Sequence, residues 1–270
     1  MELSFSQASC IRGLREHMAT QDLGADPAAT IAAMDVRYAR TTSRNVLAAL
    51  KKMYPNVARF AEEAKARREE LQALDNTQEP TAKQEAKYVS WTDLIAWRDA
   101  NKDNLSATDY LLLCLYTMMP PRRLDFTPMK IVRRKPRKME DGVNYLVLGK
   151  SSVTFIFHAY KTHAVYGDQT VKAPKQLERV VRSFLAAFPD SVYLLEDEHH
   201  HPWQEQRLSH TIQRIFKKHH GMDTSVNTIR HSYLTFIYKG MPSKQQLEAI
   251  AWTMGHSLSQ SQAYRHLKLE

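Results

Sequence analysis

The sequence has few cysteines and no long apolar segment. Its two cysteines, Cys10 and Cys114, both lie among apolar residues with helical spacing, where thiols are typically buried and reduced. The longest apolar run, at 110–119, is too short to cross a bilayer, and the N-terminus has no apolar stretch followed by a cleavage site. We therefore expect a soluble intracellular protein without a disulfide framework.

Several common catalytic patterns are also missing. The chain has no glycine-rich phosphate loop, no Ser-His-Asp spacing and no paired carboxylates of the kind that perform acid–base chemistry. Three consecutive histidines occur at 199–201, but adjacent side chains cannot all face one ion, and no second His or Cys pair has suitable spacing. The sequence predicts neither a metal nor a cofactor.

Basic residues are abundant by contrast. The chain has 270 residues, 43% of them hydrophobic, and a net charge of +9. This length suffices for one large domain or two ordinary ones with a real core. The positive charge suggests a polyanionic partner. We expect nucleic acid rather than a membrane, because no amphipathic segment has a uniformly basic polar face.

Residues 1–73 show helical periodicity and are predicted to form a helical domain. Apolar residues recur every three to four positions near the N-terminus, and further helices are expected at 27–36, 41–54 and 57–74. The helix at 41–54 carries its apolar residues on one face and Arg44, Lys51 and Lys52 elsewhere. We predict that these three cations contact DNA.

The polar segment 74–88 lacks periodicity and is interpreted as a linker to a mixed domain at 89–270. That domain is expected to contain an all-round apolar, buried helix at 106–119 and strands at 144–149, 152–160 and 169–173. Helices are predicted at 90–102, 174–187, 205–218, 228–239 and 243–254. The fold class is therefore mainly α with a small antiparallel β-sheet, an α+β architecture.

Two arginines, Arg122 and Arg123, directly follow the buried helix and its Pro120-Pro121 end. A guanidinium at the end of a rigid element could hold a phosphate bidentately, or the pair could be simply solvated. The basic run that follows is expected to contact a nucleic acid backbone. The run begins with Lys130, Arg133 and Arg134, and Arg123 is predicted to contact DNA together with them.

Three further positions could carry chemistry. Lys161 lies in the turn after a strand, where it could reach a phosphate or donate a proton, or be an ordinary hairpin lysine. Arg230 is expected in the first turn of an apolar helix, where it needs a carboxylate or a ligand phosphate as its partner. His256 and Tyr264 stand close together near the end of the chain, behind a Gly-His-Ser turn.

The order of these features resembles that of the tyrosine recombinase (phage integrase) family. An arginine after a buried helix, a hairpin lysine, "NTIRHS", "GHS" and a late tyrosine follow one another over essentially the whole chain. Residues 1–73 resemble the family's helical (SAM-like) core-binding domain and 89–270 its catalytic domain. The sequences of 120–126 and 160–167 resemble those of integrases of viruses and mobile elements more than those of bacterial chromosome-dimer resolvases.

The resemblance implies a catalytic set. The family's first arginine is followed three residues later by an acid, which fits Arg122 with Asp125 and leaves Arg123 as the rival. The other members would be Lys161, Asn227, Arg230, His256 and the nucleophile Tyr264. Asn227 stands where the family usually has His or Lys, and Tyr264 follows His256 by eight residues where about nine is common. An amide can donate a hydrogen bond but cannot shuttle a proton.

The family chemistry implies that Tyr264 attacks a phosphodiester of double-stranded DNA and forms a 3′-phosphotyrosyl bond without metal or ATP. It also implies a homotetramer on two DNA sites, with a monomer or dimer when free. The short tail after Tyr264 implies a short or absent exchange helix. The expected location is at DNA, in the cytoplasm of a prokaryotic host or in the nucleus or viral factory of a eukaryotic one.

Alternatives with the same chemistry are a type IB topoisomerase and a hairpin telomere resolvase. A third alternative is a catalytically weakened DNA-binding relative, which the amide at Asn227 suggests. The DNA target, the direction of the reaction and the accessory factors are not encoded in any recognisable pattern.

Overall fold

A computed structural model describes residues 3–77 and 79–265. The chain divides into two compact units, Met1–Thr77 and Gln78–Glu270, each with its own hydrophobic core. The predicted linker 74–88 is partly helical, because α4 continues to Thr77 and α5 (Ala82–Glu85) follows. A capping box between Thr81 and Gln84 starts α5.

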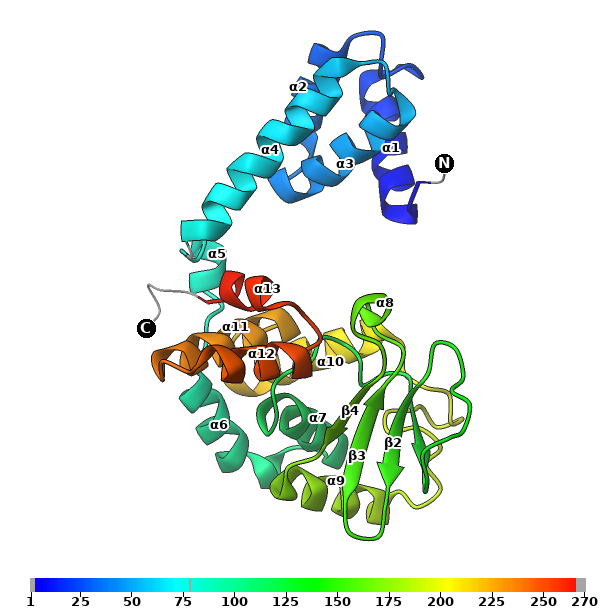
Figure 1. Cartoon of the computed structure of the whole chain (residues 1–270), viewed down its shortest axis with the longest axis vertical. Helices are drawn as coiled ribbons and strands as arrows, with labels where there is room; N and C mark the ends of the chain where they lie inside the picture. Colours follow the sequence, from blue (N-terminus) through cyan, green and yellow to red (C-terminus); the bar gives the residue numbers. More distant parts are fainter. Residues whose placement is uncertain (1–2, 78, 266–270) are drawn as a thin grey trace. The chain divides into compact units, whose positions relative to one another are not determined.

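The N-terminal unit consists of α1 (Phe5–Met18), α2 (Pro27–Arg37), α3 (Arg40–Met53) and α4 (Ala58–Thr77) (Figure 1). Ser4 caps α1 and Asp26 caps α2, so local side chains satisfy the first backbone amides. Its core is formed by the apolar faces of these helices. The residues with no exposed surface include Leu14, Leu23, Met34, Val46, Leu47, Leu50 and Phe60.

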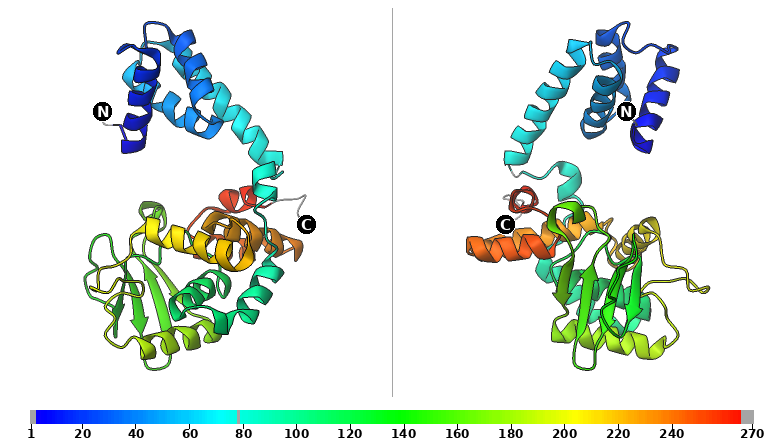
Figure 2. Two further views of the ribbon diagram at one scale, coloured as in Figure 1. Left: turned by 180° about the vertical axis from the view of Figure 1, so that it is seen from behind. Right: turned by 45° about the vertical axis from the view of Figure 1, so that its right-hand side comes forward.

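The C-terminal unit is built around α7 (Ala107–Thr117), against which α6, α9 and α10 pack (Figures 1 and 2). Leu111 to Tyr116 are all buried, as the all-round apolar sequence predicts. The other helices are α6 (Trp91–Ala100), η1 (Lys102–Asn104), α8 (His163–Tyr166), α9 (Lys175–Ala187), α10 (Glu205–His220), α11 (Val226–Lys239), α12 (Lys244–Thr253) and α13 (Leu258–Ala263).

The sheet has the order β1-β2-β3-β4, with strands Met129–Val132, Asn144–Leu148, Val153–Phe157 and Gln169–Lys172. The antiparallel pairings of β2, β3 and β4 agree with the sequence prediction. The prediction of an entirely antiparallel sheet was wrong, because β1 was not foreseen and pairs in parallel with β2. The connection at 133–143 returns the chain to the same end of the sheet, as a parallel pair requires. The α+β class itself is confirmed.

Helix starts in the C-terminal unit follow local capping. Ser90, Ser106 and Ser243 each accept a hydrogen bond from the backbone N–H three residues on. Ser225 caps α11 in the same way, so this helix begins at Val226 rather than 228. Arg230 consequently lies one turn inside α11 and not in its first turn, which corrects the sequence prediction.

Within the described ranges, no helix combines the length and apolar character needed to span a membrane.

Candidate active site

One cleft in the C-terminal unit brings together segments that are far apart in the sequence. It has a volume of about 320 Å³ and is lined by residues from 123–125, 160–162, 227–230 and 254–264. These include most of the predicted catalytic set. The members are Lys161, Asn227, Arg230, His256 and Tyr264, together with Arg123.

Arg122 lies behind the cleft wall and has no exposed surface. Its Nε donates to Asp125 Oδ2 at 2.7 Å, and its Nη1 donates to Gln169 Oε1 at 2.6 Å and to the Thr253 carbonyl at 2.7 Å. The guanidinium stacks over the Phe157 ring at 3.9 Å from the centroid. These contacts fix the orientation of the Arg122 guanidinium. Its Nη2 has no hydrogen-bond partner among the described residues.

Gly255 lets the chain pass close to Arg122. Its φ of +70° is in the left-handed region, and a Cβ at this position would lie 2.8 Å from Arg122 Nη2. A side chain here would therefore both strain the backbone and clash with the unpartnered nitrogen. The Gly-His-Ser turn thus passes against the only Arg122 nitrogen that lacks a partner in the described structure, and this nitrogen is buried.

Arg230 and His256 form a buried pair with 4% and 6% exposure. Arg230 Nη2 lies 2.6 Å from His256 Nδ1. A guanidinium can only donate, so Nδ1 must accept, and the neutral imidazole then carries its proton on Nε2. Both Arg230 Nε and His256 Nε2 lack partners among the described residues. The structure gives Arg230 no carboxylate within ion-pair distance in the described ranges.

Tyr264 lies at the C-terminal end of α13 and is the third member of the group formed with Arg230 and His256. Its ring lies 5.0 Å from the Arg230 guanidinium carbon and is stacked on His256 with centroids 5.7 Å apart. Its carbonyl is 2.8 Å from His231 Nδ1. The phenol is thus in the same cleft as both partners and is partly exposed.

Lys161, Asn227 and Arg123 occupy the more open part of the cleft, and all three are exposed. Lys161 lies in the β3–β4 hairpin, which Figure 1 shows with α8 at one end of the sheet. The next residue, Thr162, donates to the Gly255 carbonyl at 2.7 Å and so ties the hairpin to the turn that holds His256. Arg122 and Arg123, the rivals for the first arginine, differ clearly, because only Arg122 is buried and held by an acid.

The unpartnered groups have one chemical property in common. Arg122 Nη2, Arg230 Nε and His256 Nε2 are all hydrogen-bond donors. Among the described residues that line the cleft, Asp125 is the sole carboxylate, and it is already paired with Arg122. A buried surplus of positive charge and unpaired donors is costly unless an anion occupies the site. The cleft is therefore suited to an anionic ligand with several oxygens.

The protonation of His256 gives a testable dependence of stability on pH. Burial, together with the charges of Arg230 and Arg122, lowers the pKa of His256 from 6.5 to about 3. The unfolded chain therefore binds a proton on this residue as the pH falls below 6.5, whereas the folded chain does not. The contribution of neutral His256 to the free energy of unfolding is therefore fully present above pH 6.5, and it is lost as the pH falls from 6.5 toward 3.

We expect the free energy of unfolding of the wild type to fall by up to about 1.4 kcal/mol per pH unit more steeply than that of His256→Gln. Urea unfolding of both proteins between pH 6.5 and 4.5, without DNA, measures this difference. If the free energies of unfolding of the two proteins changed equally with pH, His256 would not be kept neutral in the folded protein.

The remaining predicted DNA contacts lie outside the cleft. Lys130 lies on β1 and donates to Glu140 at 2.7 Å. Arg133 lines a separate hollow beside Arg182, and Arg134 is exposed on the connection after β1. In the N-terminal unit, Arg44, Lys51 and Lys52 line one groove of about 890 Å³.

Sequence reasoning missed the residues that hold the site together. Gln169 is fully buried and links Arg122 to the Trp252 carbonyl through its amide, which donates at 2.8 Å. Tyr160 lies 4.8 Å from the Arg122 guanidinium carbon. No local pattern marks either residue. Their roles arise from contacts with distant segments of the chain, namely with Arg122 for both residues and with the Trp252 carbonyl for Gln169.

Comparison with known proteins supports the fold. No protein-family model and no curated protein matches the sequence. The chain is similar to the crystal structure of the XerH site-specific recombinase bound to difH substrate, a pre-cleavage complex, with a TM-score of 0.58 and 12% identity over 98% of this chain and 75% of that one. The XerA recombinase aligns over 97% of this chain and 85% of that one, with 16% identity and a TM-score of 0.49. The similarity to XerH shows that the chain has the fold of that recombinase, which agrees with the fold that the motifs predict.

Proposed function

We propose that this chain is a site-specific DNA recombinase that cleaves and rejoins duplex DNA through a 3′-phosphotyrosyl intermediate. The observation that carries the proposal is the group of three unpartnered donors, from Arg122, Arg230 and His256, in and behind the cleft that holds Tyr264. A phosphodiester has the charge and the oxygens that such donors bind. The structurally similar XerH is described in complex with its DNA substrate, which agrees with DNA as the ligand.

In the proposed reaction, Tyr264 Oη attacks the phosphorus, the bond to the 5′-oxygen breaks, and the partly exposed phenol releases its proton to water. Arg122 and Arg230 neutralise the charge that builds up on the non-bridging oxygens, and His256 donates Nε2–H to one of them. Lys161 donates the proton that the departing 5′-oxygen requires. Asn227 donates a hydrogen bond from its amide.

The reverse step completes the exchange. A 5′-hydroxyl of a second strand attacks the phosphotyrosyl bond and releases Tyr264, so the covalent intermediate conserves the energy of the broken bond. Because the arginines carry the charge, the proposed chemistry uses neither ATP nor a catalytic metal ion.

The groove of the N-terminal unit is proposed to bind the DNA backbone. Five cations line it, namely Arg44, Lys51, Lys52, Lys65 and Arg68. They come from both α3 and α4, so each of the two helices contributes positive charge to the groove.

We expect Lys51→Gln/Lys52→Gln to weaken binding to all DNA sequences alike. Each lost phosphate contact reduces the slope of log K against log salt by about 0.9, so the double variant should lose up to about 1.8. Fluorescence anisotropy over a salt series measures the slope. Arg59→Gln is the matched control, because this exposed residue is on α4 but does not line the groove. A slope unchanged in the double variant, or lowered equally in the control, would place the DNA elsewhere.

Trapping of the covalent adduct tests the proposed activity. Nicked duplexes of random sequence are incubated with the protein, so that cleavage beside the nick releases a short fragment and prevents religation. The expected product is a protein–DNA adduct resistant to denaturation, and sequencing of the trapped DNA identifies the target. If no adduct forms at any salt concentration, the chain is a DNA-binding relative without catalysis.

A plasmid with two copies of the recovered target separates recombination from its alternatives. Recombinant product supports the recombinase, whereas relaxation alone indicates a type IB topoisomerase, and hairpin ends indicate a telomere resolvase. The proposal extends to a homotetramer on two DNA sites, acting at DNA inside the cell in the integration of a viral or other mobile element. Measurement of the mass of the protein–DNA complex on target DNA tests whether four chains assemble on two sites.

A further inference from the structure

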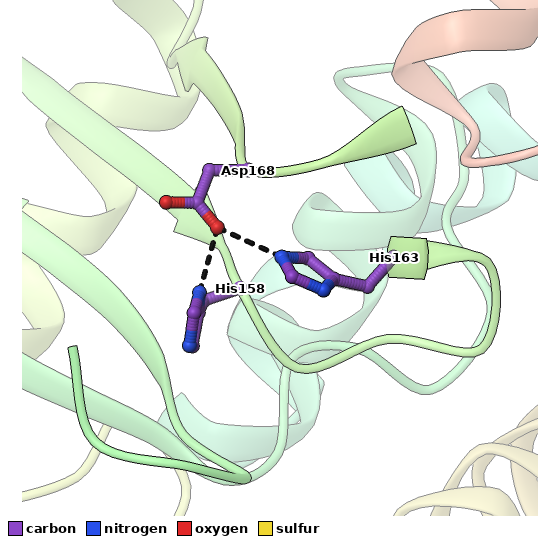
Figure 3. A group of neighbouring side chains, drawn as sticks. All are labelled: His158, His163 and Asp168. Carbon is purple, nitrogen blue, oxygen red and sulfur yellow. Dashed lines mark hydrogen bonds and ion pairs between the residues drawn. The ribbon is translucent and has the colours of Figure 1, made fainter. Parts of the chain in front are cut away.

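Two histidines and one aspartate converge at the base of the β3–β4 hairpin (Figure 3). His158 Nδ1 lies 2.6 Å from Asp168 Oδ1, and His163 Nε2 lies 2.9 Å from the same oxygen. One ligand atom from each residue lies within 4.8 Å of the other two. Figure 3 shows both rings turned toward the carboxylate.

The three residues come from different parts of one hairpin. His158 directly follows β3, His163 begins α8, and Asp168 directly precedes β4. The strand pairing of β3 with β4 holds the first and last of them side by side. The rings and the carboxylate are partly accessible, with side-chain exposures of 21% for His158, 36% for His163 and 38% for Asp168. An ion can therefore enter from solvent.

We propose that His158, His163 and Asp168 bind one Zn²⁺ ion. Imidazole nitrogen and carboxylate oxygen are the ligands of zinc sites with three protein ligands, whose fourth position is taken by water. Bonds of about 2.0–2.1 Å in tetrahedral geometry place ligand atoms about 3.3 Å apart. The present separations of 2.6 and 2.9 Å would need to widen by about 0.7 and about 0.4 Å, which rotation of the exposed Asp168 side chain can supply.

The ligand types also indicate which ions the site would take. Two imidazoles and a single carboxylate favour zinc and other borderline metals over Mg²⁺ and Ca²⁺, which prefer oxygen ligands. The tract His199 to His201 differs from this cluster, because its side chains pair separately with neighbouring carboxylates. It is therefore the natural internal control for nonspecific zinc binding.

The ion would join the two ends of the turn that contains Lys161. Tyr160, Lys161 and Thr162, which line the cleft, all lie between His158 and His163. A zinc ion at this position would restrict the turn and hold Lys161 over the cleft. This consequence rests on the proposed function, whereas the binding of zinc does not.

Zinc titration of the untagged, metal-depleted full chain tests the proposal. Calorimetry with Zn²⁺, and the visible absorption of Co²⁺ as a spectroscopic probe, should show one tight site per chain. His163→Gln and Asp168→Asn should each weaken binding by at least tenfold, since even loss of outer-shell partners costs about 10–100-fold. His199→Gln/His201→Gln should bind like the wild type.

The proposal is overturned if zinc does not bind, if both single variants bind as the wild type does, or if only the 199/201 variant loses the ion. Circular dichroism without metal establishes that each variant is folded. As a second measurement, Zn²⁺ should raise the thermal midpoint of the wild type but not that of His163→Gln. Zinc binding without DNA cleavage would contradict only the proposed function, and cleavage without zinc binding would contradict only this inference.

Discussion

Tyr264→Phe should abolish the covalent protein–DNA adduct while DNA binding remains. The substitution removes only the attacking oxygen. The ring that stacks on His256 and lies over Arg230 is retained, as is the backbone carbonyl next to His231. We expect adduct formation to fall by about 10⁴-fold or more, since loss of a nucleophile removes the covalent route itself. Denaturing gel electrophoresis of suicide-substrate reactions measures it.

The matched control is Tyr160→Phe, because Tyr160 is a second phenol in the same cleft. Its hydroxyl donates to the Gly167 carbonyl at 2.7 Å, and burial raises its pKa. Both features make it the poorer nucleophile. We expect adduct formation to persist in this variant. An adduct that survives Tyr264→Phe and disappears in Tyr160→Phe would assign the nucleophile to the hairpin instead.

Substitution of the two buried arginines should affect cleavage alike but stability differently. We expect Arg122→Gln and Arg230→Gln each to slow cleavage by about 100- to 1,000-fold, the usual cost of losing a donor to the charge of a transition state. Single-turnover cleavage of a nicked duplex, at saturating protein, measures the rate without the contribution of binding.

The difference in stability follows from their partners. Arg122 neutralises Asp125 and also bonds Gln169 and the Thr253 carbonyl. Removing it should cost about 3–5 kcal/mol in the free energy of unfolding, because a buried charge loses its partner. Arg230 has no carboxylate partner among the described residues, so Arg230→Gln should leave stability unchanged or increase it. Urea unfolding without DNA distinguishes the two variants.

Arg123→Gln is the control for both experiments. Arg123 is exposed at the cleft and lacks the hydrogen bonds that hold Arg122. The Arg123→Gln substitution should therefore lower the cleavage rate far less than Arg122→Gln. If Arg230→Gln destabilised the protein as strongly as Arg122→Gln, Arg230 would be a structural residue. The interpretation of its unpaired Nε as a phosphate ligand would then fail.

The local features of the fold were predictable because they depend on neighbours in the sequence. Serine caps and apolar spacing located the helices, and the β-branched runs located β2 and β3. The end of α4 and the start of α11 were each misplaced by a few residues, since competing caps and fraying decide helix ends. β1 was missed because its four residues are too short to show a period.

The order of arginine, lysine, arginine, histidine and tyrosine along the chain, and the acid three residues after Arg122, were readable in the sequence alone. Only the tertiary structure decided that Arg122 is buried while Arg123 is exposed, and that Gln169 and the Thr253 carbonyl hold its guanidinium. It alone brought His158, His163 and Asp168 together. The physical reason is the sequence separation of the interacting residues. A helix cap or a helical face is formed by residues within a few positions of one another. The contact of Arg122 with Thr253 spans 131 positions and exists only once the core has packed.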